Sequence, residues 1–361
     1  MDWGAALTGR QVPWGFDEAV REGAGLVSNQ ATARETEHGT KQGLCDNPSQ
    51  GAAATPMVAP PHNSEVITTM RIRSSIIAAL AALALVTSAC GSSSSAGGDL
   101  LARIQENGVI RISTDPNYPP YSSLEDGEYV GFDIAVAQLI ANALEVEIEW
   151  QTPSWDALTA GNWGDRWDMS VGSMAQTSER SKVIDFSVPY YYAYAYIAVP
   201  ASSTATSLAD LAGKTGCVGS ATLYESWLKG ELANDKFVIV SSAPPADVIV
   251  ESQETDNLCI EALQAGRSWD FFVQSDAFID NAITETGTVD EATGEVTNPL
   301  IKYLDNTAVT AERISVAFDK SGLNNQSLLK RVNEILTKAH ESGVLTALSE
   351  EYLSKDYTKA P

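Results

Sequence analysis

Side chains that could carry out catalytic chemistry are scarce in this chain of 361 residues. The chain has 3 His and 4 Cys, and His38 and His62 both precede residue 70. That leaves His340, which lies near the end of a predicted C-terminal helix. The sequence contains no CxxC motif with a neighbouring His, which is the usual spacing of a structural metal site. We therefore predict no catalytic residue, no metal site and no cofactor.

Two cysteines, Cys217 and Cys259, belong to the part of the chain that we expect to be exported. A pair of cysteines in an oxidising compartment indicates one disulfide. A metal-binding pair is the alternative, but the spacing and the absence of a nearby His do not favour it. Cys45 lies in an N-terminal segment, residues 1–69, that has neither helical nor strand periodicity.

An export signal is predicted at residues 70–89. Two arginines follow Met70, and the apolar run Ile76 to Val86 has 11 residues. A membrane span needs about 20 apolar residues, so the pattern is typical of a secretory signal peptide. Such a signal belongs at an N-terminus, so we expect translation to start at Met70. Residues 1–69 are then a mis-assigned upstream extension or, alternatively, a disordered leader.

The signal ends in small residues and a cysteine, Cys90, which resembles a bacterial lipobox. We expect Cys90 to be lipid-modified and to anchor the protein to a membrane. A free thiol after cleavage by an ordinary signal peptidase is the alternative. The Ser- and Gly-rich residues 90–99 are typical of a flexible tether.

The charge of the chain is strongly acidic. Lys plus Arg number 23 and Asp plus Glu number 47, for a net charge of −24. Nucleic-acid binding requires a basic face, so this composition argues against it. The hydrophobic fraction of 44 % is sufficient for a sizeable core. The length suggests roughly two domains, at about 100–200 residues each.

From residue 99 onward, predicted strands and helices alternate, which indicates an α/β architecture with a parallel sheet. The expected strands are 109–113, 146–150, 167–171, 190–200, 215–218, 237–241, 269–274 and 313–318. The expected helices are 100–107, 132–144, 157–162, 222–232, 257–265, 328–339 and 344–353, with a further helix beginning at Thr177 and a hairpin at 287–297.

Four segments, in order, resemble the amino-acid-type substrate-binding proteins of ABC transporters, solute-binding protein family 3. They are 108–121, 131–137, 172–180 with 185–191, and 343–353. The resemblance implies a two-lobed fold of the periplasmic-binding-protein type II, with a ligand cleft between lobes joined by two crossing hinge strands. By this analogy the first lobe comprises 100–197 plus 313–361 and the second comprises 199–311. A small-molecule ligand and a membrane permease are the implied partners.

The resemblance assigns ligand-binding roles to several residues. Arg180 corresponds to the arginine that binds a ligand carboxylate, and a guanidinium suits this role because it donates two parallel hydrogen bonds. Ala175 would donate from its backbone N–H, and Ser173 from its hydroxyl or backbone. Ser220 and Thr222 lie at a helix N-terminus, which favours an anion.

Tyr118 and Trp155 occupy positions on each side of the ligand in the family, and Asp115 beside Tyr118 is a candidate partner for a cationic group. Without the resemblance, the two aromatic residues would be assigned to the core and Asp115 to a turn.

Two neighbouring positions are candidates for the residue that pairs with a ligand ammonium. The resemblance places it at Ser275, whereas the nearest carboxylate is one residue further, at Asp276. A slip of one residue in a strand turns the side chain to the opposite face. Either Asp276 reaches the ammonium or the ligand is not a standard α-amino acid.

The same fold resembles periplasmic cyclohexadienyl dehydratases and membrane-bound lytic transglycosylases, and a sensory or adhesion module is a third class. A dehydratase would need a cleft acid with a raised pKa, and a transglycosylase would need an additional catalytic domain. We predict binding and delivery to a permease, without chemistry on the ligand, at the outer face of the cell membrane or in the periplasm.

Overall fold

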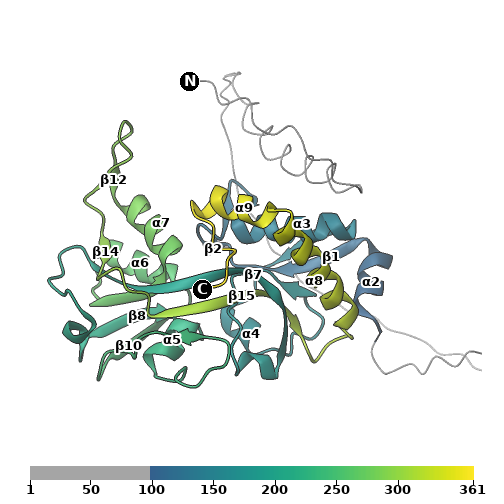
Figure 1. The fold of residues 1–361 in the computed structure, drawn as a ribbon, viewed down its shortest axis with the longest axis horizontal. Helices are drawn as coiled ribbons and strands as arrows, with labels where there is room; N and C mark the ends of the chain where they lie inside the picture. The colour runs from purple at the N-terminus through teal and green to yellow at the C-terminus, as the bar shows by residue number, and fades with distance from the viewer. Residues whose placement is uncertain (1–97) are drawn as a thin grey trace, which may run out of the picture. The chain divides into compact units, whose positions relative to one another are not determined.

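The computed structural model describes residues 98–361 (Figure 1). The predicted leader 1–69, the signal peptide 70–89 and Cys90 lie outside the described residues, so these assignments remain predictions. Within the described part, strands and helices form two groups of elements, called here the first and the second lobe.

The first lobe is a parallel arrangement of strands covered by helices. Its strands are β1 (Val109–Ser113), β5 (Glu147–Gln151) and β6 (Met169–Ser170), and β1 pairs in parallel with both neighbours. Its helices are α2 (Leu100–Asn107), α3 (Phe132–Leu144), α4 (Trp155–Thr159), α8 (Gln326–Glu341) and α9 (Val344–Leu353). A small antiparallel sheet accompanies them, made of β2 (Asn117–Tyr118), β3 (Ser122–Glu125) and β4 (Glu128–Val130).

Local sequence explains the limits of the first-lobe helices. The Asp99 carboxylate accepts a hydrogen bond from the Ala102 N–H at 2.9 Å and caps α2, which ends at Gly108 with φ of 66°. Helix α3 buries apolar residues at helical spacing, including Phe132, Val136 and Ile140. The helix predicted at 132–144 is therefore confirmed.

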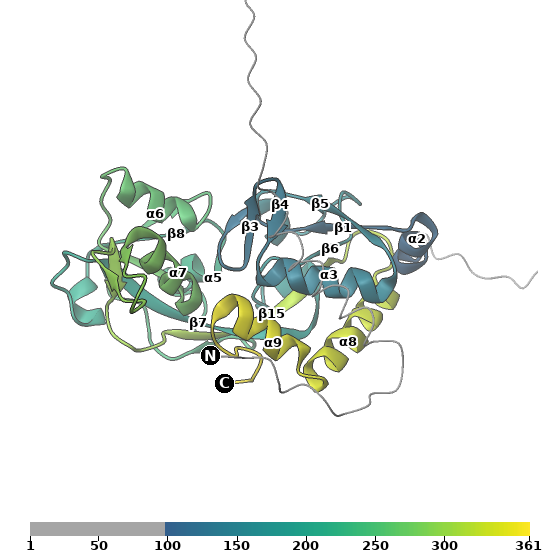
Figure 2. The same cartoon turned by 90° about the horizontal axis from the view of Figure 1, so that it is seen from above.

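The second lobe repeats this pattern. Its parallel strands are β8 (Thr215–Gly219), β10 (Ile249–Gln253) and β11 (Phe271–Ser275), with β8 between the other two. Its helices are α5 (Leu223–Leu228), α6 (Asn257–Gln264) and α7 (Asp276–Thr286). Shorter strands are β9 (Ile239–Val240), β14 (Ile301–Tyr303) and the hairpin β12 (Thr288–Val289) and β13 (Val296–Thr297). Seen from above, α5, α6 and α7 gather on one side of the described chain and α2, α3, α8 and α9 on the other (Figure 2).

Two long strands connect the lobes, β7 (Ile184–Pro200) and β15 (Thr310–Asp319). They are antiparallel neighbours from Ile184 with Asp319 to Ala195 with Thr310. Strand β7 also pairs with β11 and β14 of the second lobe. Strand β15 also pairs with β6 of the first lobe and with β9 of the second. One sheet therefore runs through both lobes, in the order β10-β8-β11-β7-β15-β6-β1-β5.

Some predicted elements differ from the observed ones. The helix expected from Thr177 is a 3₁₀ turn, η1 (Arg180–Lys182), in which the Thr177 hydroxyl accepts a hydrogen bond from the Arg180 N–H at 3.1 Å. The helix expected at 157–162 begins earlier, at Trp155. Strand β10 and helix α7 were not predicted, because neither segment has a clear apolar period and their packing against β8 and β14 is a tertiary effect.

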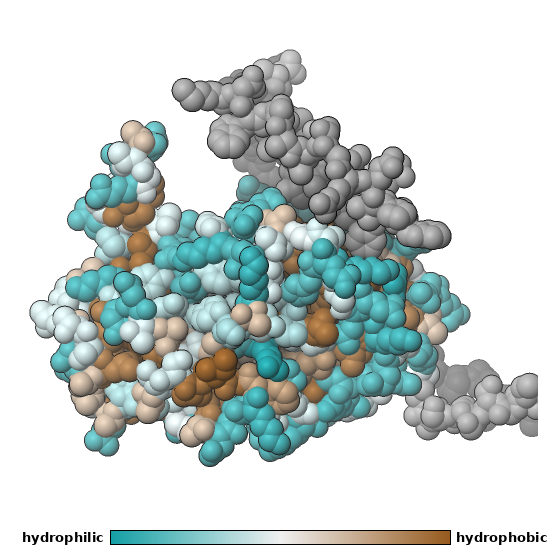
Figure 3. Space-filling model, in the orientation of Figure 1, coloured by the Kyte–Doolittle hydropathy of each residue, from teal (hydrophilic) through white to brown (hydrophobic). Residues whose placement is uncertain are grey.

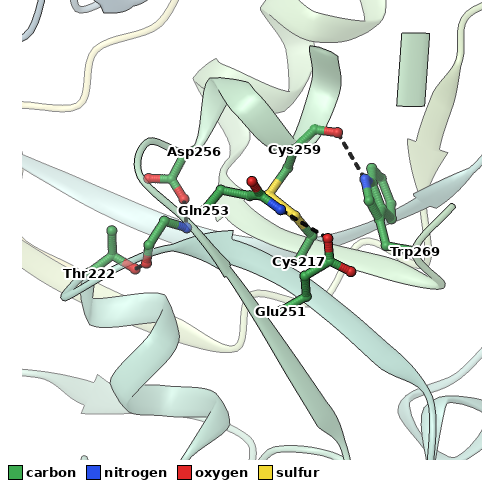
Figure 4. The surroundings of a disulfide bond; sticks show 8 residues. Cys217, Thr222, Glu251, Gln253, Asp256, Cys259 and Trp269 are labelled. Carbon is green, nitrogen blue, oxygen red and sulfur yellow. Dashed lines mark hydrogen bonds between the residues drawn. A yellow bond between two sulfur atoms is a disulfide. The ribbon is translucent and has the colours of Figure 1, made fainter. Parts of the chain in front are cut away.

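Cys217 of β8 and Cys259 of α6 form a disulfide, with a Cα–Cα distance of 5.9 Å (Figure 4). Both cysteines are fully buried. The indole N–H of Trp269 donates to the Cys259 carbonyl at 2.8 Å. The bond ties together two elements whose ends, at Gly219 and Asp256, lead into the cavity described next.

The face of the molecule in Figure 3 is mainly hydrophilic, with smaller hydrophobic patches, as the acidic composition predicts. No helix among residues 98–361 is long and apolar enough to cross a membrane. The remaining histidine, His340, packs its Nε2 within 2.8 Å of the Pro189 carbonyl oxygen and lies away from the cavity.

Candidate functional site

A cavity of about 260 Å³ lies where the carboxyl ends of five parallel strands meet. Residues that follow β1, β5, β6, β8 and β10 all contribute to its lining. Open α/β sheets bind ligands at this edge, because the loops after the strands converge there. Those loops supply Thr114–Tyr118, Thr152–Trp155, Gly172, Ser173, Thr222–Tyr224 and Glu254–Asp256. The wall is completed by Leu158, Ala175, Arg180 and Glu312.

Arg180 is the one basic side chain in the lining and is only 8 % exposed. Its Nη1 donates to the Ala175 carbonyl at 2.8 Å and its Nη2 donates to the Ala221 carbonyl at 2.9 Å. A guanidinium has five N–H donors, so three remain for a ligand. Burial lowers the pKa of Arg180 to about 10, so the side chain is still a cation at neutral pH.

Trp155 and Tyr118 both line the cavity. The Arg180 guanidinium carbon lies 5.3 Å from the centroid of the Trp155 ring, a cation–π distance, and the indole N–H donates to the Ala221 carbonyl at 3.1 Å. Tyr118 stacks on Tyr121 and Phe278, and its hydroxyl donates to Gln274 at 3.0 Å. Each ring therefore packs against the hydrophobic core and also lines the cavity.

Ala221 carries contacts between the lobes. Its carbonyl accepts from both Trp155 and Arg180 of the first lobe, and its φ is 54°, a left-handed value that is uncommon for a residue with a Cβ. Ser220 beside it donates to Asp156 at 3.1 Å. Ser220 was expected to contact a ligand. It does not line the cavity and instead joins the lobes.

Two small residues of the first lobe lie at the cavity with different hydrogen-bonding capacity. Ser173 donates from its hydroxyl to Asp133 at 2.8 Å and accepts from Tyr191 at 2.8 Å, and its N–H donates to the Tyr190 hydroxyl at 3.2 Å. Its proposed donors are therefore engaged within the protein. The Ala175 N–H makes no hydrogen bond within residues 98–361 and remains available.

Thr222 caps α5 and lines the cavity. Its hydroxyl donates to the Gly219 carbonyl at 2.7 Å and accepts from the Glu225 N–H at 3.2 Å. The hydroxyl is thus committed to the cap. Thr222 therefore places the N-terminal turn of α5 at the cavity wall.

The predicted ammonium partners do not line the cavity. Ser275 caps α7 and accepts from the Tyr121 hydroxyl at 3.0 Å, deep in the core. Asp276 accepts from the Tyr357 hydroxyl at 2.7 Å and from the Lys355 ammonium at 3.4 Å. The strand ends in a helix cap at Ser275, so Asp276 turns toward the C-terminal segment and not toward the ligand space.

Three carboxylates that sequence reasoning missed occupy the lining, the exposed Glu254 and the buried Asp256 and Glu312. Asp256 is 7 % exposed and accepts from the Gly219 N–H at 2.7 Å (Figure 4). Glu312 is 2 % exposed and accepts from the Thr310 hydroxyl at 2.7 Å. The available signals were only positional: Asp256 directly precedes a predicted helix, and Glu312 directly precedes a predicted strand.

Burial shifts the ionisation of these acids. It raises the pKa of Asp256 to about 7, with a smaller upward effect from the Asp115 carboxylate and an opposing effect from the Gly219 hydrogen bond. It also raises the pKa of Glu312 to about 7, opposed by the Thr310 hydrogen bond and by the charge of Arg180. Asp115, which lines the cavity as predicted, has a pKa raised by burial and lowered by a hydrogen bond from the Asn117 N–H.

Two α/β lobes, joined by a pair of long antiparallel strands around a cavity at the strand ends, define the two-lobed type II fold of solute-binding proteins. The sequence model of the bacterial extracellular solute-binding proteins, family 3, matches residues 110–355, more than half of the chain. The chain belongs to this family.

Individual relatives agree with this assignment. The chain is 29 % identical over 263 residues to the L-cystine-binding protein TcyJ of Escherichia coli (strain K12), covering 72 % of this chain and 88 % of that protein. An ancestral arginine-binding protein bound to arginine superposes with a TM-score of 0.56 at 25 % identity, covering 68 % of this chain and 98 % of the other. A cyclohexadienyl dehydratase of Pseudomonas aeruginosa is 37 % identical over 116 residues, which is 32 % of this chain and 42 % of the enzyme.

These findings support a solute-binding role outside the cytoplasm. The match to the L-cystine-binding protein covers 72 % of the chain, whereas the match to the dehydratase covers 32 %. Within residues 98–361, no group of three or more His, Cys, Asp or Glu side chains is placed to hold a metal ion.

Proposed function

We propose that this protein is the extracytoplasmic binding component of an ABC importer, which captures an amino acid or a related small carboxylate and delivers it to a permease. The observation that carries the proposal is a buried, charged Arg180 that lies in a cavity between two lobes and keeps three donors free. Burying a ligand carboxylate requires a charge partner, and a guanidinium meets it with two parallel hydrogen bonds.

Closure of the two lobes would complete the site. The first lobe supplies Arg180, Trp155 and Ala175, and the second supplies the turn around Ala221 and the start of α5. The carbonyl of Ala221 meets Arg180 and Trp155 only when the lobes are together. The closing motion is a rigid-body rotation about β7 and β15, and the closed form is the one that a permease would recognise.

We keep three further assignments as parts of the proposal. The lobes divide as 100–197 plus 313–361 and 199–311. Residues 70–89 direct export, and Cys90 carries a lipid that holds the protein at the outer face of the membrane through the tether 90–99. Such an anchor would keep the binding protein close to its permease.

Ligand-dependent thermal stabilisation tests the proposal. The purified protein is heated with each of the amino acids and with related small acids, and binding raises the midpoint because the ligand binds only the folded state. Arg180→Ala is expected to abolish the shift while the circular dichroism spectrum is unchanged. Arg267→Ala, which removes an exposed arginine of the same lobe as Ala221, is the matched control and should keep the full shift. A full shift in the Arg180 variant would remove Arg180 from the site.

An enzyme of the dehydratase type is the second candidate, and Asp256 and Glu312 are the observation in its favour. Both are buried cavity acids with a pKa near 7, a condition that a general acid must meet. The charge of the cavity argues against a dehydratase, because prephenate and arogenate each carry two carboxylates and the cavity lining is already acidic. Incubation with either compound, followed by product chromatography, decides between the two, and turnover would replace the transport proposal.

A further inference from the structure

The charges that line the cavity do not balance. Arg180 is the one cation in the lining, whereas carboxylates come from Asp115, Glu254, Asp256 and Glu312. Glu254 is exposed and well solvated, which leaves three partly or fully buried acids against one guanidinium. A zwitterionic amino acid adds one carboxylate and one ammonium, and so leaves this excess of negative charge unchanged.

The two most buried acids of the lining form no ion pair within residues 98–361. Neither Asp256 nor Glu312 forms an ion pair with any Lys or Arg among the described residues. Buried carboxylates are almost always paired, because an isolated charge away from water is costly. The Oγ1 atoms of Thr114 and Thr255, which also line the cavity, are buried and make no hydrogen bond within residues 98–361. Carboxylates without an ion-pair partner and hydroxyl groups without a hydrogen bond therefore surround this part of the cavity.

The acids follow one another away from Arg180. The charges of Arg180 and Asp256 both act on Glu312, so both are neighbours of this carboxylate, and Glu312 lies at the end of the cavity where the ligand carboxylate would bind. The carboxylate of Asp115 acts in turn on Asp256, which places Asp115 and Asp256 together. A ligand that pairs with both Glu312 and Asp256 carries one cation beside its carboxylate and a second cation further along.

We propose that the ligand is a cationic amino acid, with its α-ammonium at Glu312 and a side-chain ammonium or guanidinium at Asp256 and Asp115. This inference rests on the proposed function, since it names the ligand class of the same cavity. It also accounts for Ser275: the protein needs no acid there, because Glu312 on the connecting strand β15 supplies the charge. Tyr118 and Trp155 form walls for the aliphatic part of such a ligand.

Calorimetric titration with two matched pairs of ligands tests the inference. L-Arginine is compared with L-citrulline, which has nearly the same shape but no side-chain charge, and L-lysine with L-norleucine. The charged member of each pair is expected to bind at least about 30-fold more tightly, because breaking a buried charge pair weakens binding by that much or more. Asp256→Asn should remove most of this preference and leave citrulline binding nearly unchanged.

Two variants complete the design. Glu312→Gln should weaken all four ligands together, since each carries an α-ammonium, whereas Glu285→Gln, an exposed acid on α7, should change none of them. Circular dichroism establishes that each variant is folded. Equal binding within both pairs would overturn the cationic ligand and leave amino-acid binding intact. Failure of every amino acid to bind would overturn the proposed function itself.

Discussion

Removal of the Cys217–Cys259 disulfide is expected to lower the free energy of unfolding by about 4 kcal/mol. The two cysteines are separated by 42 positions in the sequence. For a loop of that length the chain-entropy relation gives about 13 cal/mol/K, or about 4 kcal/mol at 25 °C. Both cysteines are fully buried, so alanine is the appropriate replacement, because serine would add a buried hydroxyl without a partner.

The assay is equilibrium unfolding in urea, followed by tryptophan fluorescence and by circular dichroism. The Cys217→Ala, Cys259→Ala double variant is compared with the parent protein in the absence and presence of a reductant. The reduced parent and the variant should show the same loss. Coincident transitions by the two probes are needed before a single free energy is fitted. A loss below about 1 kcal/mol in the variant would refute the reasoning from loop entropy.

Two further predictions concern polar groups behind the cavity. Burial raises the pKa of Asp133 from 3.8 to about 7, so the stability that this carboxyl contributes is fully present below pH 4 and is lost as the pH rises through 7. The free energy of unfolding of the Asp133→Asn variant should therefore rise relative to that of the ligand-free parent by up to about 4 kcal/mol between pH 4 and pH 8, at about 1.4 kcal/mol per pKa unit. Urea unfolding at several pH values measures this difference. A difference that does not change with pH would contradict the prediction. Tyr357→Phe removes the 2.7 Å hydrogen bond to Asp276 and should cost about 2 kcal/mol. Lys359→Ala, which removes an exposed ammonium from its pair with Asp356, is the control and should lower the free energy of unfolding by at most about half as much. Equal effects of the two changes would show that the Tyr357 hydrogen bond contributes no more than a surface ion pair.

Local pattern was sufficient for much of the fold. Helix α3, strand β1 and the two C-terminal helices have their apolar residues at a regular period, so the sequence predicts them within a residue or two. Strand β7 was predicted only from residue 190, but it begins at Ile184. Pro189 lies inside it, opposite Ser315, where the pairing with β15 shifts register. A proline usually indicates the end of a strand, because it cannot donate a ladder hydrogen bond. Only the pairing with β15 reveals the bulge that accommodates Pro189.

For the site, the sequence by itself determined the basic residue and most of the wall. The family resemblance predicted seven residues that line the cavity, Asp115, Tyr118, Trp155, Ser173, Ala175, Arg180 and Thr222. Only the tertiary structure decided which further acids line the cavity. Ser275 ends a strand and Asp276 follows it, as the motif requires, but a helix cap at Ser275 turns both side chains away from the cavity. Asp256 and Glu312 come from segments 56 positions apart with no local signal, and they meet because β10 ends and β15 crosses at the same edge of one sheet. Which acids line the cavity depends on the positions of the strand ends in the folded protein. Long-range strand pairing determines those positions, and local residue spacing does not encode it.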